Sequence, residues 1–175
     1  EPNIRIEKVF RTEEGLGGVS CSSTGRVVVA VGKGSLYRYD DQGLSRLHPP
    51  SAFKYSKVKQ IDSHIWLMGY KMLNSNSNSV ETGESGIVLF SADRGATWED
   101  RTPKQIRFFS DIDLRNNEGW LTGSDGSLFY SNDNGESWRD VAIPTKSHLY
   151  NIFFLDKRNI WIGGLNSTVL KYDID

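Results

Sequence analysis

The sequence predicts an all-β fold built as a repeat array, and three observations support this prediction. One eight-residue pattern, S-x-D-x-G-x-x-W, occurs twice, at residues 91–98 and 131–138. The two copies begin 40 residues apart, which is a period typical of one supersecondary unit per repeat. Short alternating or apolar runs precede both copies, as expected for strands. The whole chain is therefore interpreted as a series of similar β units.

Each copy of the pattern has the composition of a tight turn that closes a hairpin. The Asp side chain can accept hydrogen bonds from N–H groups of its own turn, and the Gly can adopt a positive φ at no steric cost. The Ser can add a second local hydrogen bond, while the Trp places a large apolar ring beneath the turn. We therefore predict a self-contained structural turn made by Ser91, Asp93, Gly95 and Trp98 and again by Ser131, Asp133, Gly135 and Trp138.

These turns and the strands before them, residues 86–90 and 126–130, resemble the Asp-box (BNR) repeat of sialidase-type β-propellers. The longer unit that begins at residue 119 is most similar to the propeller of photosystem II assembly and stability factors. Complete and degenerate copies together span nearly the whole chain. The resemblance implies a β-propeller whose boxes lie away from the central binding face. It therefore implies structural rather than catalytic roles for Asp93 and Asp133.

Four units follow one another once this frame is fixed. The first has a strand near residues 18–22 and a degenerate box at residues 36–43, which retains Asp41 and Gly43 but has Arg46 in place of the Trp. The second and third contain the complete boxes, and the fourth ends inside its turn. We predict a single domain, residues 1–175, of about four four-stranded blades, with units at about 11–50, 51–103, 104–145 and 146–175 plus 1–10.

The fourth unit lacks an outer strand, and we expect the alternating run at residues 3–10 to supply it. Pairing the two ends of the chain would close the ring and remove exposed sheet edges. The alternative is an arc of a larger propeller, completed by another copy or by another segment. The chain is accordingly expected to be a monomer, or a homodimer that completes a larger ring.

Charge and residue content exclude several classes of function. The chain has 21 Lys and Arg against 22 Asp and Glu, so its net charge of −1 gives no signature of nucleic-acid binding. No apolar run approaches the roughly 20 residues of a membrane span, so membrane insertion is not expected. The single cysteine, Cys21, allows no intrachain disulfide and is expected to be a buried small apolar residue. Three scattered histidines show no zinc-type spacing, and we predict no metal and no cofactor.

Three tryptophans, Trp66, Trp120 and Trp161, recur at one position of successive units and are expected to pack between blades. The interval at residues 71–85 departs from the period because it holds a polar insertion. It is either a tolerated loop or a binding segment, since long insertions in repeat proteins map to loops on one face. Loops before the first strand and after the second strand of each blade share that face. The candidate partner-binding residues are Asn74, Asn76, Asn78, Glu81, Glu84, Phe53, Tyr55, Lys104, Lys146 and His148.

Three functional classes follow from these features. The first is a non-enzymatic scaffold that binds a protein partner through its loops, as the assembly-factor resemblance implies. The second is a sialidase-type hydrolase or glycan-binding module; a hydrolase of this type needs an arginine cluster, a Tyr nucleophile with a Glu and an acid/base Asp. Arg26, Arg107, Arg115 and Arg158 lie near strands or turns, but no FRIP-like segment accompanies them. The third is a recognition domain excised from a larger protein, because the chain starts at Glu1 and stops within a turn. The resemblance slightly favours a location outside the cytoplasm.

Overall fold

The computed structural model of the chain describes residues 12, 15–22, 27–31, 35–71, 85–104 and 108–172. The regular elements of these residues are β1 (Leu16–Cys21), β2 (Val27–Val31), β3 (Leu36–Asp40), β4 (Gly43–Leu47), β5 (Phe53–Ile61), β6 (His64–Lys71), β7 (Gly86–Ser91), β8 (Glu99–Asp100), β9 (Phe109–Arg115), β10 (Glu118–Gly123), the 3-10 turn η1 (Ser124–Gly126), β11 (Leu128–Ser131), β12 (Arg139–Asp140), β13 (Leu149–Asp156), β14 (Asn159–Gly164) and β15 (Val169–Tyr172). No helix among the described residues is long and apolar enough to cross a membrane.

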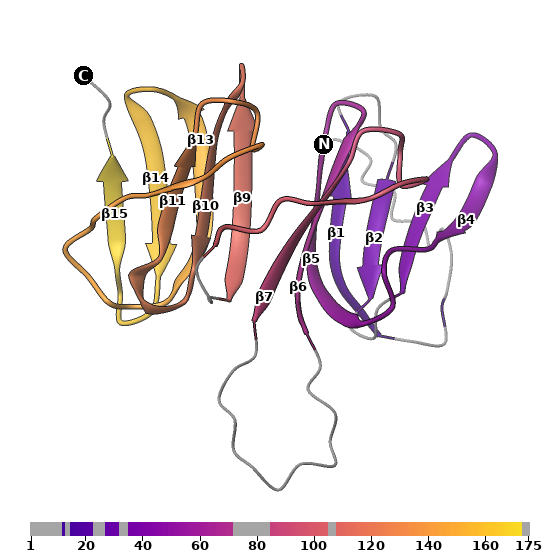
Figure 1. Cartoon of the computed structure of the whole chain (residues 1–175), viewed down its shortest axis with the longest axis horizontal. Helices are drawn as coiled ribbons and strands as arrows, with labels where there is room; N and C mark the ends of the chain where they lie inside the picture. The colour runs from indigo at the N-terminus through magenta and orange to yellow at the C-terminus, as the bar shows by residue number, and fades with distance from the viewer. Residues whose placement is uncertain are drawn as a thin grey trace, which may run out of the picture.

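The strands form four antiparallel sheets in chain order, made by β1–β4, β5–β8, β9–β12 and β13–β15. Each sheet is an up-and-down meander, since strands that are neighbours in sequence are neighbours in the sheet. Figure 1 shows the sheets in succession, from the first on the right to the fourth on the left. One apolar cluster fills the space between each successive pair of sheets. The predicted all-β, propeller-type architecture is confirmed.

Both Asp-boxes form the predicted turns by the same set of hydrogen bonds. Ser91 Oγ donates to the Asp93 carboxylate over 2.8 Å, while the N–H of Gly95 donates to Ser91 Oγ over 2.7 Å. The N–H and the hydroxyl of Thr97 both donate to the Asp93 carboxylate, over 2.8 and 2.6 Å. Gly95 has a φ of +91° and Arg94 one of +62°, so both residues occupy the left-handed region. The second box repeats these bonds with Ser131, Asp133, Gly135 and Ser137.

The hydrogen bonds also stabilise the charged form of both box carboxylates. The hydroxyl and N–H of Thr97, together with the Ser91 hydroxyl, lower the pKa of Asp93 to about 2. Desolvation raises the pKa of Asp133, but the hydroxyl and N–H of Ser137 and the Ser131 hydroxyl outweigh it and lower that pKa to about 2. Neither carboxylate is therefore available as a proton donor near neutral pH.

Each box fits against the sheet that precedes it in the chain. A Cβ on Gly135 would lie 2.4 Å from the Trp66 ring of β6, and one on Gly95 would lie 2.6 Å from Leu47 of β4. The Trp138 ring meets the Trp66 ring edge to face, with centroids 6.3 Å apart. Trp138 Nε1 donates to the carbonyl of Arg101 over 3.0 Å. The boxes thus hold successive sheets together, and their glycines are needed for contact as well as for φ.

The degenerate box of the first sheet differs from its prediction in one residue. The carboxylate that accepts the turn N–H, from Gln42 over 2.9 Å, belongs to Asp40 and not to the predicted Asp41. Asp40 and Gly43 are cross-strand partners, so only two residues connect β3 and β4. Gly43 has a φ of +96°, as a positive-φ turn glycine should. The shorter hairpin moves the accepting carboxylate one position earlier.

The first strands of successive sheets lie side by side, β1 with β5, β5 with β9, and β9 with β13. Carboxylates on β9 connect the sheets on either side. Lys59 Nζ lies 3.4 Å from the Asp113 carboxylate, which also accepts the N–H of Phe154 over 2.9 Å. Lys57, Asp111 and Ile152 repeat this arrangement. These polar links fix the inner edges of the sheets relative to one another.

The outward faces of the first and fourth sheets depart from two predictions. Trp66 and Trp120 are 1% exposed, as expected for side chains packed between blades, but Trp161 is 46% exposed. The expectation that Trp161 is buried is wrong because no described sheet follows the fourth one. Cys21 is likewise exposed rather than buried, since it lies on the face of β1 that points away from β5. The predicted closing strand, residues 3–10, lies outside the described residues.

Candidate partner-binding face

The connections of the propeller emerge at two opposite ends of the sheets. We call one end the loop face: it contains the connections between sheets, residues 48–52, 101–104, 108 and 141–148, and those between second and third strands, residues 124–127 and 165–168. The other end, the box face, carries both Asp-boxes and the turns between first and second strands. The sequence predicts partner binding at the loop face.

Hydrogen bonds join the loops of the third and fourth sheets into one layer. The N–H of Ser124 donates to the carbonyl of Phe108 over 2.9 Å, within the third sheet. The N–H of Gly126 donates over 3.0 Å to the carbonyl of Ser147, which belongs to the connection that enters the fourth sheet. The loop that follows β14 continues the layer, because the N–H of Leu165 donates to the His148 carbonyl over 2.8 Å. Loops of both kinds therefore converge at this end, as predicted.

A glycine at the end of each second strand allows this convergence. A Cβ on Gly123 would lie 2.0 Å from the carbonyl oxygen of Phe108, and one on Gly69 would lie 2.1 Å from that of Lys54. Such distances exclude any side chain unless the backbone moves. The sequence signal was present, since a Gly follows each recurring Trp, but its role in packing the loops against the first strands was not predicted.

His148 lies at the centre of the loop layer. Its Nε2 is 2.6 Å from Ser110 Oγ on β9, and its ring stacks on Tyr150 with centroids 4.7 Å apart. The half-buried imidazole thus connects the third sheet to the start of β13. Ser110 and Tyr150 were not predicted as site residues because neither belongs to a connecting loop.

The structure separates the predicted binding residues into three groups. Lys104 and Lys146 are exposed on the loop face, and Phe53 and His148 are half-buried there. Tyr55 is fully buried, and its hydroxyl donates to the carbonyl of Pro50, so it belongs to the core and cannot contact a partner. Burial accordingly raises the pKa of the Tyr55 hydroxyl. The insertion residues Asn74, Asn76, Asn78, Glu81 and Glu84 lie outside the described residues.

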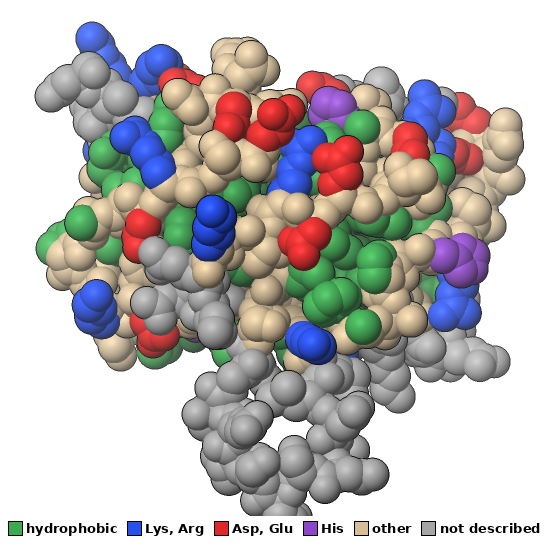
Figure 2. Space-filling view, in the orientation of Figure 1, with side chains coloured by type: hydrophobic (Ala, Val, Ile, Leu, Met, Phe, Trp, Pro, Cys, Tyr) green, Lys and Arg blue, Asp and Glu red, His purple; other side chains and the backbone are tan. Residues whose placement is uncertain are grey.

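The charges described on the loop face are mainly positive. Lys54, Lys71, Lys104 and Lys146 lie in or beside its loops, against one acidic residue there, Asp125. The wider surface differs, because Figure 2 shows acidic and basic side chains interspersed without a large area of one sign. The loop face therefore has a local positive character that the net charge of −1 conceals.

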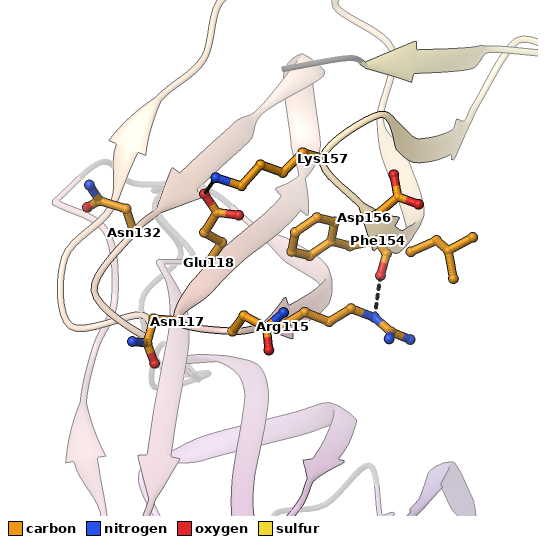
Figure 3. A pocket seen from close by; sticks show the side chains of 9 residues that line it. Arg115, Asn117, Glu118, Asn132, Phe154, Asp156 and Lys157 are labelled. Atoms are coloured by element: carbon orange, nitrogen blue, oxygen red, sulfur yellow. Dashed lines mark hydrogen bonds and ion pairs between the residues drawn. The ribbon is translucent and has the colours of Figure 1, made fainter. Parts of the chain in front are cut away.

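A cavity of about 490 Å³ lies on the box face, between the turns β9–β10 and β13–β14. Figure 3 shows that its charged side chains interact with one another or with the backbone. Lys157 Nζ lies 2.9 Å from the Glu118 carboxylate, and Arg115 Nε donates to the Phe154 carbonyl over 2.8 Å. Desolvation raises the pKa of Glu118, but hydrogen bonds from Lys157 and Tyr130 outweigh it and leave the pKa lowered.

This cavity contains a Tyr–Glu contact of the kind that a sialidase needs, so its chemistry must be compared with that of a hydrolase. The Tyr130 hydroxyl donates to Glu118 over 2.8 Å, but burial raises the pKa of Tyr130, which opposes phenolate formation. The hydrogen bond from the Asn159 side chain lowers the pKa of Asp156, the other carboxylic acid of the cavity. Neither carboxylic acid stays protonated at neutral pH, as a glycosidase acid must.

The same family model matches this chain twice, at residues 56–147 and 108–173, and describes the photosynthesis system II assembly factor YCF48. The two matches together cover about two thirds of the chain. A search of curated proteins finds no match.

Solved structures are similar to this chain over most of its length. A structure of YCF48 bound to D1 peptide has a TM-score of 0.75 at 19% identity, over 95% of this chain and 53% of that chain. YCF48 from Cyanidioschyzon merolae has a TM-score of 0.67 at 19% identity, over 90% of this chain and 50% of that one. The computationally designed Ika4 protein has a TM-score of 0.67 at 12% identity, over 98% of this chain and all of its own. The likeness establishes the fold, and the chain spans about half the length of each YCF48 chain.

Proposed function

The chain belongs to the family of the photosynthesis system II assembly factor YCF48, and from this premise we propose a non-enzymatic scaffold that binds a protein segment through its loop face. The observation that carries the proposal is the hydrogen-bonded layer in which Gly126 meets Ser147 and Leu165 meets His148. Loops of two sheets thereby form one continuous surface. A related YCF48 has been solved bound to D1 peptide, which supports a peptide segment as the ligand.

The side chains of the loop face favour a segment that carries negative charge. Lys104 and Lys146 are exposed in successive connections between sheets, where a bound segment crossing the face would contact both. Complementary charge mainly raises the association rate and selects between partners. Phe53 and the His148–Tyr150 pair supply apolar and aromatic surface at the same end. A role outside the cytoplasm, as an assembly factor, belongs to the same proposal.

The cavity of the box face supports a scaffold more than a hydrolase. Its Arg115 donates Nε to a backbone carbonyl, and its Tyr130 has a raised pKa and lies under the guanidinium of Arg139. A carboxylate-binding arginine cluster and an activated nucleophile would have to be assembled from other groups. A glycan ligand is therefore the secondary candidate, and a fluorogenic sialoside assay tests it directly.

The binding test uses fluorescence anisotropy with labelled D1 peptide and a scrambled peptide of the same composition. Lys104→Glu combined with Lys146→Glu should weaken binding at least tenfold, because two attractive contacts become repulsive. The control, Lys157→Glu with Arg158→Glu on the box face, makes the same charge change and should leave binding unaltered. Equal losses in both variants would mean a non-specific charge effect and would contradict the proposed face.

The insertion is tested in the same assay. Replacing residues 74–83 with a Gly-Ser segment should leave the unfolding curve unchanged and weaken peptide binding. Unchanged binding would remove the insertion from the proposed site and leave the loop layer as its only part.

A further inference from the structure

The two end sheets carry large apolar side chains on the faces that no described sheet covers. On the fourth sheet, Phe153 is 56%, Trp161 46% and Val169 69% exposed. Phe153 and Trp161 are direct cross-strand partners, and we call these three residues the tail face. On the first sheet, Val19 is 69% and Leu44 43% exposed. Exposed apolar surface gathered on one face of a sheet indicates a contact site rather than a solvated surface.

Val19 and Leu44 belong to one surface, which we call the head face and define as Val19, Cys21, Tyr39 and Leu44. Tyr39 and Leu44 are cross-strand partners and lie opposite to Leu36, which points into the core. Val19 and Cys21 alternate with Ser20, whose Oγ accepts the N–H of Gln60 on the second sheet. Because side chains alternate along a strand, Val19 and Cys21 point away from the second sheet.

The repeat itself shows what the tail face would accept. Trp66, Trp120 and Trp161 occupy the same position, but only the first two have a following sheet. Trp66 is covered by the Trp138 ring of the third sheet, and Trp120 lies 4.9 Å from the Tyr172 ring of the fourth. Trp161 therefore lies where the next blade of a propeller would pack.

The residue beside each Trp gives the chemistry of that next blade. Lys59 and Asp113 are the cross-strand partners of Trp66 and Trp120, and both are tied to neighbouring sheets by polar contacts. In the fourth sheet this position is Phe153, so the polar link of the inner blades is replaced by an apolar ring. An apolar tail face matches an apolar partner, and the head face of this same chain is one.

We propose that two copies of this chain join head to tail, with the tail face of each packed on the head face of the other. Two such junctions close a two-fold ring, in which both apolar faces are buried. The arc follows about half of two longer chains of the same fold, with TM-scores of 0.75 and 0.67, so two arcs have the curvature to complete a ring. The net charge of −1 per copy opposes this association little.

Light scattering coupled to size exclusion measures the mass of the 175-residue chain. The expected mass is twice 19.7 kDa, and Trp161→Asp or Leu44→Asp should each reduce it to 19.7 kDa. Leu165→Asp is the matched control, because Leu165 is as exposed as Trp161 but lies in a loop-face connection. A monomeric parent chain would overturn the proposal, and the faces would then be covered by something other than a second copy.

Mixing the two monomeric variants tests the head-to-tail arrangement. Each variant keeps the face that the other has lost, so a mixture should regain one junction and the dimer mass. If Leu44→Asp alone stayed dimeric while Trp161→Asp did not, the contact would be tail to tail and the proposal would fail.

A measurement on the unmodified chain removes any dependence on the folding of the variants. Cys21 is the single cysteine and belongs to the head face, so a thiol reagent should label it several-fold faster after dilution to the monomer. A labelling rate that does not change with protein concentration would overturn the proposal.

Discussion

Replacing the two box tryptophans by phenylalanine compares two rings that differ in one hydrogen bond. Trp138 Nε1 donates to the Arg101 carbonyl over 3.0 Å. Trp98 Nε1 is buried and has no hydrogen-bond partner in the described part of the chain. Both rings are half-buried and pack against the apolar cluster next to their box. Trp98→Phe and Trp138→Phe therefore remove similar contacts but opposite polar terms.

The expected magnitudes follow from that difference. The smaller ring loses packing worth about 1 kcal/mol at either site. Trp138→Phe also loses a hydrogen bond with a net value of about 1 kcal/mol, giving a total loss of about 2 kcal/mol. Trp98→Phe instead removes a buried unpaired N–H, whose cost of about 1–3 kcal/mol offsets the lost packing. We expect Trp98→Phe to be neutral or stabilising.

Urea unfolding followed by far-UV circular dichroism measures both variants without relying on tryptophan fluorescence. At this chain length, a difference of about 2 kcal/mol corresponds to about 4–8 °C in Tm, so a thermal scan provides a second reading. The m-values must agree, so that the midpoints report stability alone. Equal losses in the two variants, or a larger loss at Trp98, would refute the reasoning.

Two further predictions concern the same turns. Because the folded-state pKa values of Asp93 and Asp133 are lowered from 3.8 to about 2, their stabilisation is complete above about pH 4 and is lost as the pH falls towards 2. Urea midpoints between pH 6 and pH 2 should fall less in a variant with Asn at both positions; parallel curves would contradict this. Gly135→Ala should destabilise by about 1–3 kcal/mol more than Gly43→Ala, because both have positive φ but a Cβ at Gly135 alone would meet Trp66. Circular dichroism melts decide the matter, and equal losses would mean that φ alone sets the cost.

The sequence was sufficient to predict what lies within one repeat. The turn hydrogen bonds of Asp93 follow from residue types at fixed spacing, and spacing alone locates Trp66 and Trp120 at one core position. Burial of Trp161 could not be predicted in the same way. A period identifies the position of a residue in its unit, whereas its burial depends on whether another sheet follows.

Contacts between units were harder to predict for a related reason. Asp113 accepts the N–H of Phe154, 41 residues later, in agreement with the period. Its partner on the other side, Lys59, is 54 residues earlier, because the insertion of the second unit lies between them. The frame of the first box failed at Asp41 since its hairpin turn is two residues long.

The contact between each box and the sheet before it has a consequence for how such chains change over generations. The clasp, formed by Gly135 and Trp138, belongs to one unit, and the socket at Trp66 belongs to its predecessor. A tandem duplication of one such unit of about 40 residues would carry a clasp for the unit before it and a socket for the unit after it. Blade number can therefore evolve by copying or losing whole units, without new interfaces having to arise residue by residue.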